Sequence, residues 1–381
     1  MSVAPEIKGW CPGALRPMQS GDGLVVRIRP PLGRLTPAQA AAIAEAAVAH
    51  GNGIIDLSAR ANLQLRGVTE ASHPELIEDL RAQGLIDPDI ETESLRNLIV
   101  TPFRDAGTDA LALALTAALA RMPRLPGKFG FALDTGPRPA LTDASADIRV
   151  ERAADGRLIL RPDGHPLGQP VTDLAKDAQA MADWFIAHGG MTNGRGRMAA
   201  LVGRGVVPDG CNTAPAEPLP QPQPGLHPEG ALVALAFGQM LAETLSALAA
   251  LDHQIRPTPW RMLLLAGAKA MPAIPGLITN PAEPLLRVTA CTGAPGCPQA
   301  LGETRALARS LAAHLAKGLH LHVSGCAKGC AHPGLADLTL VATRQGHDLV
   351  LNGTASDTPH LCGLVPSAIP DLLKAPHAPP L

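Results

Sequence analysis

The chain has 381 residues, a formal net charge of −2 and a hydrophobic content of 46%. This length allows two or three domains, and the nearly neutral charge excludes a general attraction to nucleic acid. No apolar run is long enough to span a bilayer, and the first residues lack a secretory signal pattern, so we expect a cytoplasmic protein without structural disulfides. Because tyrosine is absent, redox chemistry would require a metal or cysteine.

The first predicted unit is a strand, a helix and a strand between residues 23 and 67. Thr36 can cap the helix, Pro37 suits its first position, and Gly51 can end it in a left-handed conformation. The flanking strands, "GLVVRIRP" and "GIIDLSARANLQLRG", alternate apolar and polar residues. Such alternation places one face of a strand on a core, so Arg27 and Arg29 are expected on the opposite face.

A second copy of this pattern occupies residues 231–268. Gly238 stands in the second copy where Gly33 stands in the first. The segments that follow also correspond, since "ADIRVERAADGRLIL" from Ala146 resembles "ADLTLVATRQGHDLV" from Ala336. Landmarks that recur in the same order predict two tandem halves.

Four cysteines form two pairs in the second half, in "CTGAPGC" (Cys291, Cys297) and "SGCAKGC" (Cys326, Cys330). Each pair follows an apolar stretch, so two loops could converge on one metal centre. The first spacing is wider than that of zinc knuckles and favours an iron–sulfur cluster, while structural zinc and unligated or redox thiols stay open. In the first half Pro102 stands where Cys291 would be, which favours a functional cluster over one that merely holds the fold.

These motifs resemble those of the sirohaem and [4Fe–4S] sulfite and nitrite reductases, over most of the chain. The resemblance implies that the four cysteines hold a [4Fe–4S] cluster and that Cys330 lies nearest the tetrapyrrole. In that family the macrocycle lies between the halves, where basic side chains pair with its carboxylates. The basic residues at matching positions are Arg27, Arg29, Arg60, Arg96 and Lys128.

The resemblance also implies an α+β fold with an internal duplication. Two ferredoxin-like half-domains and two α+β domains would be related by pseudo-two-fold symmetry. The expected parts are a first half-domain at 12–90, an α+β domain without cluster at 91–205, a proline-rich linker at 206–230, a second half-domain at 231–280 and a cluster-bearing α+β domain at 281–375.

One departure separates branches of this family. The reductases carry two lysines that hold and protonate a small anion, but here the run is "GKFG", with Lys128 retained and Gly130 in place of the second. The loss of that side chain would open room and remove a proton donor. "CTGAPGCPQALGETRALARSLA" and "VSGCAKGCAHPG" look more like the oxygen-dependent branch of aerobic cobalamin biosynthesis, in which precorrin-3A replaces sirohaem in the cleft.

That branch implies a monooxygenase that hydroxylates C20 of precorrin-3A and closes a lactone from the ring A acetate. The alternatives are a sirohaem sulfite or nitrite reductase and a non-catalytic iron–sulfur or zinc protein that binds a tetrapyrrole. Oxygen activation is expected to need a non-haem iron beyond the cluster; His322 and His332 are the nearest candidate ligands, and a structural role for both stays open. Because no dinucleotide-binding motif is found, we expect electrons from NADH to arrive through a separate reductase or ferredoxin.

Overall fold

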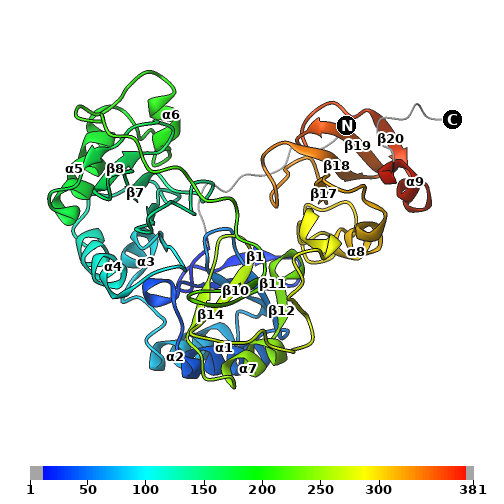
Figure 1. Ribbon diagram of the computed structural model, residues 1–381. Helices are drawn as coiled ribbons and strands as arrows, with labels where there is room; N and C mark the ends of the chain where they lie inside the picture. Colours follow the sequence, from blue (N-terminus) through cyan, green and yellow to red (C-terminus); the bar gives the residue numbers. More distant parts are fainter. Residues whose placement is uncertain (1–11, 375–381) are drawn as a thin grey trace. The chain divides into compact units, whose positions relative to one another are not determined.

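The computed structural model of the protein describes residues 12–374, and residue 375, the last of the expected cluster domain, lies outside them. The chain divides into two compact units, coloured along the sequence in Figure 1. The larger unit holds residues 12–18 and 24–279, and the smaller holds residues 19–23 and 280–374. Among the helices of residues 12–374, none is both long and apolar enough to cross a membrane.

The first half-domain is an antiparallel sheet with helices. Its elements are β1 (Met18–Ser20), β2 (Gly23–Ile28), η1 (Pro31–Gly33), α1 (Pro37–His50), β3 (Ile54–Leu57), β4 (Leu63–Val68), α2 (His73–Ala82) and α3 (Ile90–Leu95). The predicted start of α1 is confirmed, because Gln39 N donates to Thr36 Oγ1 at 3.1 Å and Thr36 N donates to Gln39 Oε1 at 3.0 Å. This capping box satisfies two backbone groups that the first turn leaves without partners.

The predicted left-handed end of α1 at Gly51 is wrong. Gly51 has φ −129°, and Gly53 is the residue that adopts the left-handed conformation, with φ +76°. Gly51 is needed for a different reason, since a Cβ there would lie 2.5 Å from the carbonyl oxygen of Arg66. A close approach of two backbone segments therefore explains this glycine.

The second half-domain repeats this order. Its elements are β10 (Gly225–His227), β11 (Gly230–Leu235), η2 (Ala236–Gly238), β12 (Gln239–Leu241), α7 (Ala242–Ala249), β13 (Ile255–Pro257), β14 (Met262–Ala266) and β15 (Leu277–Ile278). Backbone positions with positive φ also recur in the two halves. Leu32 (φ 51°) in η1 precedes α1, and Phe237 (φ 58°) in η2 precedes α7. Ala61 (φ 55°) lies just before β4, and Arg261 (φ 63°) lies just before β14, the strand that corresponds to β4. The halves therefore share one backbone plan.

The two half-domains exchange backbone pairing. Leu35 of the first half pairs with Ile255 of β13, through N–H···O bonds of 2.8 and 3.0 Å. Met240 of β12 in turn pairs with Ile55 of β3, so the first sheet has the order β1-β2-β4-β3-β12. All four residues are at most 4% exposed. Each sheet is thus completed by a segment of the other half.

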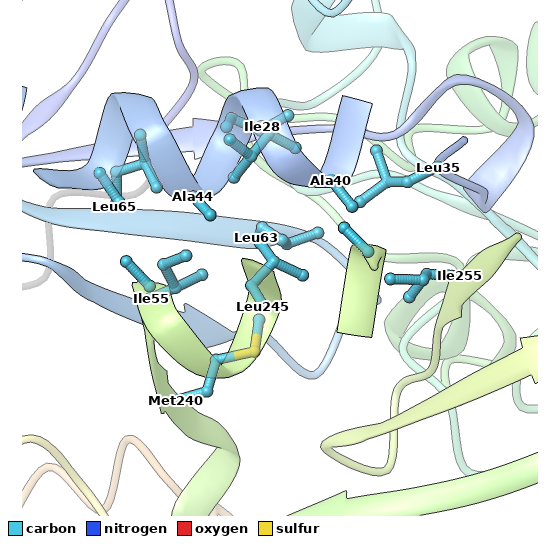
Figure 2. Packing of buried hydrophobic residues seen from close by; sticks show 14 of the residues in the cluster. Ile28, Leu35, Ala40, Ala44, Ile55, Leu63, Leu65, Met240, Leu245 and Ile255 are labelled. Atoms are coloured by element: carbon cyan, nitrogen blue, oxygen red, sulfur yellow. The ribbon is translucent and has the colours of Figure 1, made fainter. Parts of the chain in front are cut away.

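One hydrophobic core lies beneath this exchange. Helices α1 and α7 pack against each other next to the strands of both half-domains (Figure 1). Figure 2 shows side chains from the two halves in this core: Ile28, Leu35, Ala40, Ala44, Ile55, Leu63, Leu65, Met240, Leu245 and Ile255. Because burial of apolar surface is shared, the stability of each half depends on the other.

Two further sheets of five strands have the same topology. The first is built from β5 (Leu98–Val100), β6 (Phe131–Leu133), β7 (Ile148–Arg152), β8 (Leu158–Pro162) and β9 (Gln169–Pro170), with α4 (Ala106–Leu119), α5 (Leu174–Ala187) and α6 (Met198–Val202). The second is built from β16 (Val288–Ala290), β17 (Leu321–Ser324), β18 (Ala336–Thr343), β19 (Gly346–Gly353) and β20 (Leu361–Leu364), with η3 (Pro284–Arg287), α8 (Arg305–Leu311), η4 (Ala312–His314), η5 (Pro366–Ala368) and α9 (Ile369–Lys374). In both, the first three strands are parallel and the last two antiparallel.

A pair of aspartates holds corresponding turns in these two sheets. Asp147 accepts a hydrogen bond from Gly130 N at 2.9 Å, and Asp337 accepts one from His320 N at 2.7 Å. Both bonds join positions that correspond in the repeat, which supports an architectural role for the aspartates. The predicted duplication and α+β class are therefore confirmed.

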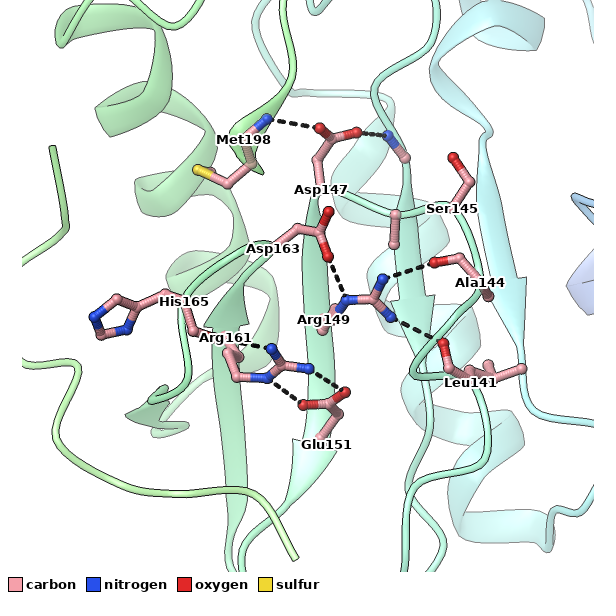
Figure 3. A network of polar contacts seen from close by, with 12 residues as sticks. Leu141, Ala144, Ser145, Asp147, Arg149, Glu151, Arg161, Asp163, His165 and Met198 are labelled. Carbon is pink, nitrogen blue, oxygen red and sulfur yellow. Dashed lines mark hydrogen bonds and ion pairs between the residues drawn. The ribbon is translucent and has the colours of Figure 1, made fainter. Parts of the chain in front are cut away.

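Ion pairs that each contain a buried residue reinforce the first of these sheets, as Figure 3 shows for Arg149 and Arg161. Arg149 donates to Asp163 at 2.8 Å and to two carbonyl oxygens, and Arg161 meets Glu151 at 2.7 and 2.9 Å. Asp147 also accepts from Arg197 at 2.9 Å. Paired and hydrogen-bonded in this way, the charges avoid most of the cost of burial.

Truncation of the shared core should affect both half-domains. We expect Ile55→Ala and Ile255→Ala each to lower the free energy of unfolding by about 2–5 kcal/mol, because each deletes buried methyl groups at the exchange. Hydrogen exchange should accelerate in β4 and β14 alike for either variant. Urea unfolding and amide exchange measure both effects.

Val48→Ala on α1 serves as the control, since Val48 is 61% exposed and its truncation should cost under about 0.5 kcal/mol. Faster exchange confined to the half that carries the substitution would contradict a shared core.

Candidate functional site

The four motif cysteines lie on two loops of the smaller unit. Cys291 directly follows β16, and Cys326 and Cys330 follow β17. Because β16 and β17 are neighbouring parallel strands, their carboxyl ends lie at the same edge of the sheet. The structure thus brings the loops "CTGAPGC" and "SGCAKGC" together.

Hydrogen bonds join these loops directly. Gly325 N donates to Cys291 Sγ at 3.2 Å, and Leu301 N donates to Gly325 O at 2.8 Å. Backbone N–H groups aimed at a cysteine sulfur stabilise the thiolate and tune the potential of a bound cluster. Two buried hydroxyls fix the backbone: Thr304 Oγ1 donates to Cys291 O and Ser324 Oγ donates to Cys326 O, both at 2.7 Å.

The four thiols share one electrostatic environment. Burial raises the pKa of the Cys330 thiol, the charge of Lys328 lowers it, and the other three cysteines raise it further. Within residues 12–374, no three His, Cys, Asp or Glu side chains lie close enough to hold a single metal ion. A multi-iron cluster differs from a single ion because each cysteine binds its own iron atom. The donor set of four cysteines fits such a cluster.

Two residues that the sequence patterns did not single out support the first cysteine loop. Ser20 Oγ donates to Gly296 O at 2.6 Å, and Gly21 N donates to the same oxygen at 3.1 Å. A Cβ at Gly21 would lie 2.1 Å from Pro295 O, so only glycine permits this contact. The segment "QSGDG" offered only a generic turn signal, because its partner is distant in sequence.

Three histidines lie beside the second cysteine loop. The rings of His320 and His332 are 4.7 Å apart, and those of His322 and His332 are 5.7 Å apart. His332 Nε2 meets Leu335 O at 2.9 Å, and His320 Nε2 meets Thr289 Oγ1 at 2.9 Å. The structure therefore brings the candidate iron ligands His322 and His332 together, each in contact with neighbouring residues.

The predicted basic residues lie in the larger unit. Arg27 and Arg29 on β2 are buried, with 7% and 5% exposure. Arg29 forms an ion pair with Glu93 at 3.0 Å, and Arg96 pairs with Asp87 through two bonds of 2.8 Å. Burial lowers the pKa of Arg29 to about 10, opposed by Glu93 and assisted by the nearby Arg27 and Arg96.

Arg27 differs from these two arginines. Among the described residues no carboxylate forms an ion pair with it, and its Nε and Nη1, like those of Arg29, are buried without a hydrogen-bond acceptor. A buried guanidinium without a counter-charge is costly, so such a group is poised to receive an anion. Three arginines and two carboxylates leave one positive charge uncompensated in this cluster.

Arg60 and Lys128 are also adjacent. Arg60 Nη2 donates to Lys128 O at 2.9 Å and to Ser145 Oγ at 3.0 Å. The expected open space at Gly130 is not found, because a Cβ there would lie 3.0 Å from Arg60 Nη1 and 3.1 Å from Asn97 O. The guanidinium of Arg60 closes this position, and Asp147 accepts a hydrogen bond from Gly130 N at 2.9 Å.

Several known proteins are similar to this chain in sequence and in fold. Residues 16–83 match the nitrite/sulfite reductase ferredoxin-like half domain. A precorrin-3B synthase of Sinorhizobium sp. is 31% identical, over 94% of this chain and 86% of the relative. A ferredoxin–nitrite reductase of Synechococcus elongatus is 26% identical, over 94% of this chain and 86% of the relative. The structure of the Mycobacterium tuberculosis NirA protein superposes with a TM-score of 0.61 at 18% identity, covering 92% of this chain and 79% of that chain.

The duplicated fold, the paired cysteine loops and these matches define an oxidoreductase. The chain belongs to the nitrite and sulfite reductase family, in the branch that contains precorrin-3B synthase.

Gly21→Ala should disturb the first cysteine loop, because the new Cβ would displace the backbone at Pro295. We expect the variant, purified without oxygen, to hold at most about half as much iron per chain as the wild type, since the overlap costs about 1–3 kcal/mol. Iron and sulfide per chain measure this loss, and circular dichroism checks the fold.

Gly334→Ala in the same unit is the matched control, because the nearest atom to its Cβ would be 3.6 Å away. Equal iron in wild type and Gly21→Ala would show that this contact does not support the loop.

Proposed function

We propose that the protein is a precorrin-3B synthase of aerobic cobalamin biosynthesis. In this reaction molecular oxygen hydroxylates precorrin-3A at C20, and the ring A acetate closes a lactone onto C1. The identity of 31% to the Sinorhizobium enzyme over 94% of the chain supports the proposal. The residues around Gly130 are the observation that favours this reaction over reduction of a small anion.

A reductase-like second lysine would be crowded at position 130. Its Cβ would meet Arg60 Nη1 at 3.0 Å and Asn97 O at 3.1 Å. Arg60 is itself held by Lys128 O and Ser145, so it cannot move without losing those bonds. Arginine is a poor proton donor at neutral pH, so the site lacks the second acid that reduction of a bound anion uses.

The arginine cluster on β2 suits a polycarboxylate substrate. We assign a substrate carboxylate to Arg27, because within residues 12–374 this buried guanidinium has no carboxylate partner and its Nε and Nη1 have no acceptor. Arg29 and Arg96 are held by Glu93 and Asp87, so they frame the site and contribute positive potential. Guanidinium groups bind carboxylates through paired hydrogen bonds, which orient as well as attract the macrocycle.

The four cysteines are assigned to a [4Fe–4S] cluster, which supplies electrons one at a time when bound. One oxygen atom enters the substrate and the other leaves as water, which consumes two electrons and two protons. NADH is the proposed ultimate donor, through a separate reductase or ferredoxin, and a non-haem iron beyond the cluster is proposed for oxygen activation. Gly325 N and the hydroxyls of Thr304 and Ser324 hold the cysteine loops during electron transfer.

Labelled oxygen tests the reaction. We expect the protein, incubated with precorrin-3A, a reductant and ¹⁸O₂, to give a product with one labelled oxygen atom by mass spectrometry. Cys330→Ser should reduce the rate at least about a hundredfold through loss of a cluster ligand. Cys362→Ser is the matched control, because Cys362 is exposed on β20. Absence of label, or stoichiometric sirohaem with turnover of sulfite or nitrite, would refute the proposal.

Substitutions of Arg27 and Arg29 should affect different quantities: the first the binding of substrate, the second the free energy of unfolding. Arg27→Met should weaken binding of a tetrapyrrole polycarboxylate by about tenfold or more, without lowering the free energy of unfolding, because it removes an uncompensated buried charge. Arg29→Met should lower that free energy by about 3–5 kcal/mol, because it leaves the buried Glu93 carboxylate with its backbone N–H donors but without a counter-charge.

Absorbance titration and urea unfolding measure the two quantities. Destabilisation by Arg27→Met with unchanged binding would reverse the assigned roles.

A further inference from the structure

A second group of arginines lies at the exchange between the half-domains. Arg34 precedes Leu35 and Arg256 follows Ile255, the two residues that pair across the exchange. Arg104 comes from a third segment, just before α4. Three distant parts of the larger unit thus bring their guanidinium groups together.

One carboxylate serves this group. Asp109, in the first turn of α4, contacts Arg34 Nη1 at 2.5 Å and Arg104 Nε at 3.1 Å. The other hydrogen bonds of these arginines go to uncharged oxygens. Arg104 Nη1 donates to Leu32 O at 2.7 Å, and Arg256 donates to Pro102 O at 2.7 Å and to Gln254 Oε1 at 3.0 Å. Three cations therefore face a single anion.

Solvent does not reach the arginine at the centre of this positively charged group. The Arg104 side chain is fully buried, and in the described part of the chain its Nη2 finds no acceptor. Burial lowers the pKa of Arg104 to about 10, and the charges of Arg256 and Arg34 lower it further against the effect of Asp109. Burial also lowers the pKa of Arg256, which Asp109 and Glu229 oppose. Nearby Glu229 forms no ion pair within residues 12–374.

This group is separate from the arginines on β2. The charges that act on Arg29 come from Glu93, Arg27, Arg96 and Asp87, and those that act on Arg104 come from Arg256, Asp109 and Arg34. Neither set includes a member of the other. The proposed substrate carboxylate at Arg27 therefore does not neutralise this second group.

We propose that Arg34, Arg104 and Arg256 form a binding site for a small oxyanion, a phosphate or carboxylate group. Arg34 and Arg256 are partly exposed and give access, while Arg104 supplies the buried donor. The N-terminus of α4, a helix of 14 residues, adds a favourable potential at the same place. An anion held here bridges the two half-domains and the first α+β domain, so it stabilises the exchange between the halves.

Thermal unfolding of the full chain with inorganic phosphate or citrate tests the site. We expect either anion to raise the melting temperature in a saturable way at constant ionic strength, as a ligand of the folded state does. The arm with the lower dissociation constant identifies phosphate or carboxylate as the preferred group. No saturable rise with either anion would overturn the proposal.

Two substitutions should move the affinity in opposite directions. Arg256→Gln should raise the dissociation constant about tenfold, because it removes a charged donor. Asp109→Asn should lower it about tenfold, because the internal carboxylate competes for the same arginines. Arg157→Gln, at an exposed arginine, should change nothing. A merely structural cluster would instead lose stability in Asp109→Asn without tighter binding, and that result would overturn the proposal.

Discussion

The structure depends on the backbone pairing that each half receives from the other. Leu35 completes the sheet of the second half at Ile255, and Met240 completes that of the first at Ile55. Buried backbone groups must find partners, so a half-domain alone would leave N–H and C=O groups unsatisfied at these places. The segment that follows β2 crosses to the other half within a few residues, so the arginines of β2 are fixed by the same exchange that holds the core.

Duplication gives one backbone plan with two sets of side chains. Asp147 and Asp337 each accept a hydrogen bond from a backbone N–H at the corresponding position of the repeat. The donor residue is Gly130 in the first copy and His320 in the second. The loop after the first strand of each α+β sheet carries cysteines in one copy and leads to Arg104 in the other. Because the aspartates and the strand pairing keep the backbone in place, these loops can differ freely. One copy carries the paired cysteines and the other a group of basic side chains.

Local patterns and repeats made much of this predictable. The capping residues of α1, the duplication and the two cysteine loops follow from short-range signals and spacing. The exchange does not, because Leu35 and Met240 look like ordinary strand residues and their partners are set by tertiary packing. The closure of Gly130 by Arg60 and the contact of Gly21 with Pro295 also join distant segments. Gly51 was misassigned because a glycine required by close approach resembles one required by a left-handed turn.

The presence or absence of a neighbouring carboxylate distinguishes arginines that cannot be told apart from the sequence. Arg27, Arg29 and Arg96 would all be candidates for a substrate carboxylate, but Glu93 and Asp87 already neutralise two of them. A carboxylate displaced from such a pair would itself need a new partner, so a paired arginine contributes less net binding than an uncompensated one. The same reasoning applies where Asp109 serves more than one arginine. In both clusters the internal carboxylates neutralise part of the positive charge, so fewer charges than arginines are left to attract an anion.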